Sequence, residues 1–156
     1  MVMCYAHYSE AQVMDGQHRS LLEGMLHARS SSALATRVAD AEGVGCCGVY
    51  VGISGTDFLI DHVKPTATEL NAFILPGNVL SVAAGRLSFV FGLKGPSMAV
   101  DTACSSSIVS THTAMTAIAS GEIDSAATCG VSSIMCVLTT GLFSAAGMLS
   151  AVRTER

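Results

Sequence analysis

Apolar and polar residues along the first half of the chain follow the patterns of one helix and one short strand. Residues 15–28 predict a helix, because Asp15 is a suitable N-cap and apolar residues recur behind it at helical spacing, namely Leu21, Leu22, Met25 and Leu26. Residues 48–53 form a short β-branched run bounded by glycines, which predicts a buried strand. Residues 30–44 and 57–67 predict loops, the first with a short helix and the second on the surface.

The second half of the chain continues this alternation of helices and strands. The predicted segments are a helix at 79–87, a turn at 91–96, a strand at 98–102, a helix at 104–120, a strand at 125–131 and a loop with a mostly apolar helix at 132–150. One face of the longer helix carries Ile108, His112, Met115 and Ile118, and Gly121 follows as its C-terminal cap. This order favours a layered α/β architecture with a buried mixed sheet.

The composition shows that the chain is short of charge. Of its 156 residues 50% are apolar and 13% are charged, against roughly 25% charged in an ordinary domain, which excludes disorder. The length indicates about one domain. A compact chain of this size cannot bury half of its residues and still cover itself with so few charges. We therefore expect it to rest against a large partner surface or to be a piece of a larger core.

The distribution of charge argues against nucleic-acid and membrane partners. The net charge is −4, and the 8 Lys and Arg residues are scattered without a cationic stripe. Residues 125–152 carry no charge and are long enough to cross a bilayer, but they contain several Ser, Thr and Gly residues and lack aromatic or basic flanks. Buried strands and the helices packed on them produce the same pattern, and we prefer that interpretation.

The cysteines and the N-terminus indicate an intracellular protein. The first residues lack the basic start and apolar core of a signal peptide. The cysteines have neither the spacing of a disulfide framework nor the C-x₂-C pairs of a zinc site, the six being Cys4, Cys46, Cys47, Cys104, Cys129 and Cys136. We expect reduced thiols, a cytoplasmic location and no bound metal.

Two further sequence features have the residue types of a functional site but not the required arrangement. Gly43, Gly45 and Gly48 have the G-x-G-x-x-G spacing of a dinucleotide site, but the predicted strand follows these glycines instead of preceding them. His112 shares a predicted helix with Cys104 but lies about 12 Å further along its axis, which is beyond the reach of a general base.

The strongest chemical signal is the sequence DTACSSS at residues 101–107, between a predicted strand and a predicted helix. A cysteine at this junction faces the N–H groups and the positive end of the helix, which favour a thiolate and can stabilise an oxyanion on an attacked carbonyl. The small residues around Cys104 allow a substrate arm to approach. The residues alone leave a second interpretation open, in which Cys104 is an inert core thiol beside a helix capped by Thr102.

This region resembles the active-site region of the β-ketoacyl synthase domain of type I polyketide synthases and related fatty acid synthases. The likeness rests on DTACSSS and on the preceding NVLSVAAGRLSFVFGLKGPSMAV, and it extends to MDGQHRSLLE, GVYVGIS, SGEIDSAATCGV and FSAAGMLS. It covers residues 10–150. The family usually has Pro-Gln-Gln where this chain has Gly16, Gln17 and His18. The resemblance therefore implies that residues 1–156 are one partial ketosynthase domain, an N-terminal half without a separate second domain.

The resemblance also implies a thiolase-like layered fold of the α-β-α-β-α type and a decarboxylative Claisen condensation. Cys104 would take an acyl chain from the phosphopantetheine thioester of an acyl carrier protein and pass it to a malonyl-type extender. No cofactor would be bound directly, and the parent enzyme would be a homodimer. The family's catalytic histidines and lysine match no motif here, so we expect this chain alone to be incomplete for the full acyltransferase reaction.

Two alternative functions remain open from the sequence. The chain could be a non-catalytic, truncated paralogue that pairs with a full-length synthase through its apolar surface. It could also be a free-standing thiol acyltransferase or hydrolase of another fold that uses Cys104, for which a nearby base is required.

Overall fold

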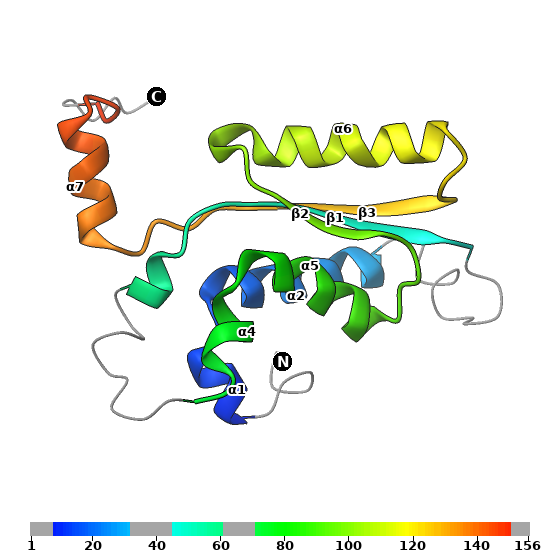
Figure 1. Cartoon of the computed structure of the whole chain (residues 1–156), viewed down its shortest axis with the longest axis horizontal. Helices are drawn as coiled ribbons and strands as arrows, with labels where there is room; N and C mark the ends of the chain where they lie inside the picture. Colours follow the sequence, from blue (N-terminus) through cyan, green and yellow to red (C-terminus); the bar gives the residue numbers. More distant parts are fainter. Residues whose placement is uncertain (1–7, 32–44, 61–70, 151–156) are drawn as a thin grey trace.

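The described part of the chain folds into a three-stranded sheet covered by helices on both faces. The computed structural model describes residues 8–31, 45–60 and 71–150. Its helix α6 lies on one face of the sheet, and α2 and α5 lie on the other (Figure 1). The elements are α1 (Tyr8–Val13), α2 (Gly16–Ser31), β1 (Cys47–Ile53), α4 (Ile74–Asn78), α5 (Leu80–Phe91), β2 (Ser97–Val100), the 3₁₀ turn η3 (Ala103–Ser105), α6 (Ser106–Ala119), β3 (Ser125–Val131) and α7 (Val137–Ala145). The layered α/β expectation is confirmed.

The sheet has the order β2-β1-β3, and both pairings among the described strands are parallel. Val49 pairs with Ser97 of β2 and with Ala127 of β3. We expected a mixed sheet, and the described part of the chain corrects this detail. Helices form the crossovers from β1 to β2 and from β2 to β3, and such a crossover returns the chain in the same direction.

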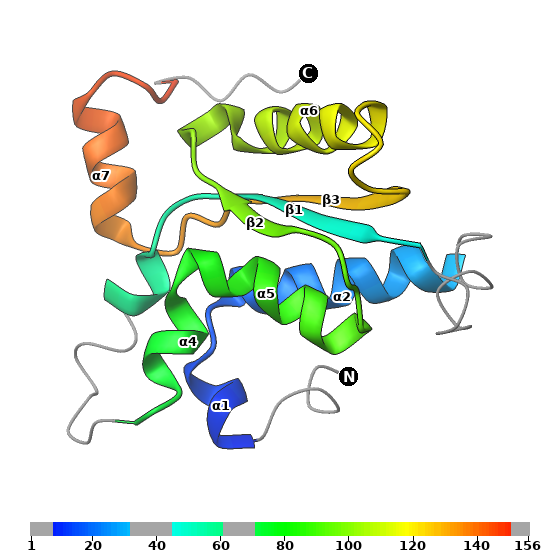
Figure 2. The ribbon, with the colours of Figure 1, turned by 45° about the vertical axis from the view of Figure 1, so that its right-hand side comes forward.

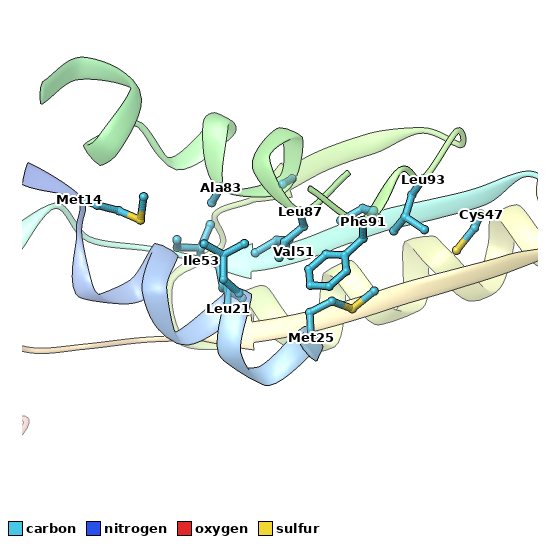
Figure 3. Close-up of a cluster of buried hydrophobic side chains, with 13 residues drawn as sticks. Met14, Leu21, Met25, Cys47, Val51, Ile53, Ala83, Leu87, Phe91 and Leu93 are labelled. Atoms are coloured by element: carbon cyan, nitrogen blue, oxygen red, sulfur yellow. The ribbon is translucent and has the colours of Figure 1, made fainter. Parts of the chain in front are cut away.

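The main hydrophobic core lies between the sheet and the α2–α5 layer (Figure 3). β1 is buried along its whole length, as its β-branched run predicts for a central strand. Val51 and Ile53 of β1 pack there with Leu87 of α5 and Leu21 of α2, and each of these side chains is at most 4% exposed. Arg86 of α5 forms an ion pair with Glu10, which ties α1 to this layer.

Helix α6 packs on the other face of the sheet through its small residues. Its buried residues are Ser106, Ser110, Ala114 and Ala117. The larger apolar residues of the predicted face point away from the sheet, and Ile108 is 74% exposed and Met115 63% exposed. The helix runs so close to the strands that only small side chains fit between them, because a Cβ added to Gly52 would meet the α6 backbone.

Three helix boundaries are set by local chemistry, and two of them, at Asp15 and Gly121, are where the sequence predicts them. The Gln17 amide donates to Oδ1 of Asp15 at 2.8 Å, so Asp15 caps α2 as predicted. α5 extends four residues past the predicted end and stops where Gly92 adopts a φ of 68°. Gly121 has a φ of 75°, as expected of a C-terminal cap.

Two predicted segments fall partly outside the described residues. Most of the predicted loop 30–44 lies there, and of the predicted surface connection 57–67 only the first four residues are described. These form a helical turn in which Asp57 is 8% exposed and Phe58 7% exposed, so the surface prediction is wrong for these two residues, whereas Ile60 is 43% exposed. In the described parts of the chain no helix has the length and apolar character needed to span a bilayer.

Candidate active site

Cys104 lies where the chain leaves β2 and enters α6, as the sequence predicts. β2 ends at Val100, η3 contains Cys104, and α6 begins at Ser106. The side chain is an exposed free thiol. Figure 2 shows that this junction lies at the carboxyl end of β2. Because both strand pairings are parallel, the carboxyl ends of β1 and β3 lie at the same edge of the sheet. Loops at this edge of a parallel sheet are the usual place for a ligand site.

Hydrogen bonds between residues close in sequence hold the turn that carries Cys104. The Ala103 amide donates to Asp101 Oδ1 at 3.1 Å, and the Thr102 amide donates to Ser106 Oγ at 2.9 Å. The Ser106 hydroxyl donates in turn to the Ala103 carbonyl at 2.7 Å. Thr102 makes no side-chain capping bond to the helix, so the capping role considered for it is wrong. The aspartate and serine of DTACSSS therefore shape the turn around the thiol.

Ala103 occupies the left-handed region with a φ of 55°, which no other described residue except glycine does. This conformation costs an L-residue about 1–2 kcal/mol. Strain of this kind persists only where surrounding contacts enforce it and is frequent at functional sites. The strained residue directly precedes Cys104 and helps to bring its side chain out of the line of the strand.

Cys104 opens into a pocket of about 460 Å³ at the end of the sheet. Its polar lining residues include Ser54 and Ser132. Its apolar lining residues include Ile134, Phe143 and Met148, which belong to the segment after β3, to α7 and to the chain beyond it. The sequence pattern does not reveal these three lining residues, since it indicates only a loop and an apolar helix there.

A larger cavity of about 550 Å³ lies elsewhere, between α2 and β3, and does not contain Cys104. The thiol in its wall belongs to Cys129, which is half-buried. Burial raises the pKa of the Cys129 thiol above its ordinary value, which lowers its thiolate fraction at neutral pH. Size alone would favour this cavity, but the exposed thiol on a strained turn favours the Cys104 pocket as the reactive site.

The described histidines lie away from this pocket. His18 is 1% exposed inside the α2–α5 layer, and burial first, then the charge of Arg86, lowers its pKa to about 4. His112 is exposed on the outer face of α6, the face that also carries Ile108 and Met115. Neither they nor His27 line the pocket, so the described part of the chain places no imidazole beside Cys104.

The described residues also bear on the metal and dinucleotide sites considered from the sequence. Among residues 8–31, 45–60 and 71–150, no group of three or more His, Cys, Asp or Glu side chains could hold a metal ion. Gly48 is the second residue of β1, so the glycine motif precedes a strand as the sequence indicated, and Gly43 lies outside the described residues.

Comparison with known proteins shows the family to which the chain belongs. Residues 5–156 match the model of the β-ketoacyl synthase N-terminal domain. The chain belongs to the β-ketoacyl synthase family. It is 39% identical over 125 residues to highly reducing polyketide synthase 19 of Pyricularia oryzae, covering 80% of this chain and 5% of that protein. It is 37% identical over 142 residues to the polyketide synthase PksL of Bacillus subtilis, covering 91% of this chain and 3% of that protein.

Solved ketosynthase structures share the fold. The ketosynthase from module 6 of the bacillaene synthase of Bacillus subtilis superposes with a TM-score of 0.70 at 35% identity, over 92% of this chain and 23% of that chain. An oxazolomycin ketosynthase domain of Streptomyces albus gives a TM-score of 0.74 at 27% identity, over 88% of this chain and 24% of that chain. The β-ketoacyl synthase chain described here thus spans about a quarter of these ketosynthases and has their thiolase-like layered fold.

Proposed function

We propose that this chain carries the nucleophile of a ketosynthase and that Cys104 is the residue that receives the acyl chain. The observation that carries the proposal is the exposed Cys104 thiol on a strained turn at the mouth of a partly apolar pocket. The apolar lining residues Ile134, Phe143 and Met148 suit an alkyl chain, and the serines of the lining suit the polar thioester end. Residues 1–156 would then be part of one ketosynthase domain.

The acyl transfer step follows from the groups at the turn. The Cys104 thiolate attacks the carbonyl carbon of an acyl thioester, and the carbonyl oxygen becomes an oxyanion. Backbone N–H groups at the start of α6 face this developing charge and lower the barrier. The tetrahedral intermediate collapses, the C–S bond to the donor breaks, and the donor leaves as a thiolate that takes up a proton. The acyl chain is then a thioester of Cys104.

Condensation is the second step that membership of the family suggests. Loss of CO₂ from a malonyl-type thioester gives a carbanion, which attacks the Cys104 thioester, forms a C–C bond and expels the Cys104 thiolate. Developing negative charge on the malonyl carbonyl needs a donor, and the described part of the pocket offers no histidine for it. We therefore expect acylation of this chain without condensation.

The partners follow from the same chemistry. An acyl carrier protein would present the acyl group on its phosphopantetheine arm, which is substrate here and not a resident cofactor. β2 lies at an edge of the described sheet, with Met98 39% exposed, and this edge suits the homodimer that the resemblance implies. Cys46, Cys47, Cys104 and Cys129 are free thiols, which suits a reducing compartment such as the cytoplasm.

Intact-protein mass spectrometry tests the proposal. Incubation with octanoyl-N-acetylcysteamine should add one octanoyl group to the wild-type chain, and Cys104→Ala should abolish the addition. Cys129→Ala, which removes a thiol outside the pocket, should still be acylated. Adding malonyl-N-acetylcysteamine should release no ketoacyl product. Acylation that persists in Cys104→Ala would contradict the assignment, and ketoacyl product from the purified chain would contradict the expected incompleteness.

The exposed apolar face of α6 favours one alternative, a non-catalytic chain that pairs with a full-length synthase. Ile108, Met115 and Ile118 form this face and are between 44% and 74% exposed. Co-expression with a full-length ketosynthase, followed by size-exclusion chromatography, separates the two functions. A stable complex with a chain whose Cys104 takes no acyl group would support the alternative.

A further inference from the structure

Asp57 is a buried carboxylate that the chemistry at Cys104 does not use. It lies in the short helical turn that follows β1 and is 8% exposed. Burying a carboxylate costs free energy unless hydrogen-bond donors surround it. The residues that donate to Asp57 therefore show which segments it connects.

All of the donors that the structure gives Asp57 come from the start of α7. Oδ2 accepts the backbone N–H of Met135 at 3.2 Å and that of Cys136 at 3.3 Å. Oδ1 accepts the Thr139 hydroxyl at 3.1 Å. Cys136 is the residue directly before the first turn of α7, so the carboxylate also lies at the positive end of that helix. Asp57 therefore joins the turn after β1 to a helix about 80 residues later in the chain.

Helix α7 has little other packing to hold it. None of its residues is buried. Figures 1 and 2 both show it beyond the end of the sheet, separate from the layers formed by α6 and by α2 and α5. Val137, Leu138 and Leu142 are each more than 60% exposed. The Asp57 carboxylate is thus a main attachment of the N-terminal end of α7.

Three apolar residues that line the Cys104 pocket lie on or beside the segment that Asp57 anchors. Ile134 lies immediately before the anchored residues, Phe143 lies on α7, and Met148 follows it. We propose that Asp57 is a positioning residue, which by anchoring the start of α7 sets the depth of the pocket and so the length of acyl chain that Cys104 accepts. The inference rests on the proposed acylation of Cys104.

The test compares three variants with the wild-type chain. Asp57→Asn keeps the shape of the side chain but removes its charge, and Thr139→Val removes the bond to Oδ1 alone. Glu23→Gln is the matched control, because it makes the same charge change at an exposed position of α2. Two readouts are measured: hydrogen exchange of the amides of residues 137–148, and the ratio of acylation rates of Cys104 by octanoyl- and acetyl-N-acetylcysteamine.

Asp57→Asn should accelerate exchange in α7 by about tenfold, as expected for the loss of one to two charge-assisted hydrogen bonds. It should also change the octanoyl-to-acetyl ratio of acylation rates by several-fold. The rate of alkylation by iodoacetamide should stay nearly constant, because this reagent needs no deep pocket. Thr139→Val should shift both readouts in the same direction by less, and Glu23→Gln should shift neither. If Asp57→Asn does not fold, the two readouts in Thr139→Val test the inference.

Three results would overturn the inference. One is unchanged exchange in α7, which shows that Asp57 does not anchor it. Another is faster exchange with an unchanged chain-length ratio, which makes Asp57 purely structural. The third is equal loss of acylation and alkylation, which indicates general damage to the fold. If the wild-type chain takes neither acyl group, the proposed function fails and length selection fails with it, while hydrogen exchange separately shows whether Asp57 anchors α7.

Discussion

Gly52 of β1 lies so close to Ser106 that a Cβ on Gly52 would be 2.5 Å from the Ser106 carbonyl carbon. The backbone of α6 therefore begins directly on the central strand, two residues after Cys104. Gly130 of β3 makes a second close approach, since its Cβ would be 2.6 Å from that of Ser107. These two glycines determine how near the start of α6, and with it the thiol, can come to the sheet.

Replacing Gly52 with alanine should displace α6 and disturb the site. The new methyl group would meet backbone atoms, which cannot rotate away, so we expect a loss of stability of about 1–3 kcal/mol. Urea unfolding measures this loss, and the rate of Cys104 alkylation by iodoacetamide should fall with it. Gly85→Ala is the matched control, because nothing lies within 4 Å of its Cβ position in α5 and helix propensity favours alanine there by about 1 kcal/mol. Equal effects of the two substitutions would contradict the close-packing account.

The strain at Ala103 predicts opposite effects for two substitutions. Ala103→Gly should raise the free energy of unfolding by up to about 1 kcal/mol, because glycine adopts a φ of 55° without a steric penalty. Ala103→Val should lower the free energy of unfolding by more than about 1 kcal/mol, since a β-branched side chain fits this region worst. Denaturant unfolding of both variants measures the effects. A more stable valine variant would show that the left-handed conformation does not exist in solution.

His18 should make the chain sensitive to acid. Its pKa in the folded chain is lowered from 6.5 to about 4, so the unfolded chain binds a proton at a higher pH than the folded chain does. The contribution of this group to the free energy of unfolding is complete above pH 6.5. It falls as the pH drops toward 4, by roughly 3 kcal/mol in total. His18→Gln removes the titrating group, so its stability should vary less with pH across this range. Parallel pH profiles for wild type and variant would refute the prediction.

The larger apolar side chains of α6 point away from the sheet, which predicts that this face of the helix tolerates substitution. Ile108→Ser should alter the stability of the chain by less than about 0.5 kcal/mol, because the side chain is 74% exposed. Ala114→Leu should cost about 1–3 kcal/mol, because Ala114 is 1% exposed against the sheet. Thermal unfolding of the two variants compares these effects. A larger loss for Ile108→Ser than for Ala114→Leu would mean that the apolar face is the one that packs on the sheet.

The location of Cys104 could be predicted from its neighbours because local chemistry creates it. A strand, a turn of small residues and a helix follow one another within residues 97–119, and the turn's hydrogen bonds join residues at most four apart. The pocket wall could not be predicted in the same way. Phe143 lies on α7, and the start of α7 is hydrogen-bonded to Asp57, some 80 residues earlier in the chain, so its place in the pocket depends on contacts between distant segments.

The amino-acid sequence by itself determined most of the elements, the cap at Asp15 and the place of the Cys104 thiol, because propensity, capping and turn chemistry act between residues a few positions apart. Only the tertiary structure decided that the sheet is parallel in its described strands, that α6 packs through its small residues, and that Asp57 fastens α7 beside the pocket. These outcomes depend on distances between segments far apart in the chain, and no local pattern of residues encodes how closely two such segments approach.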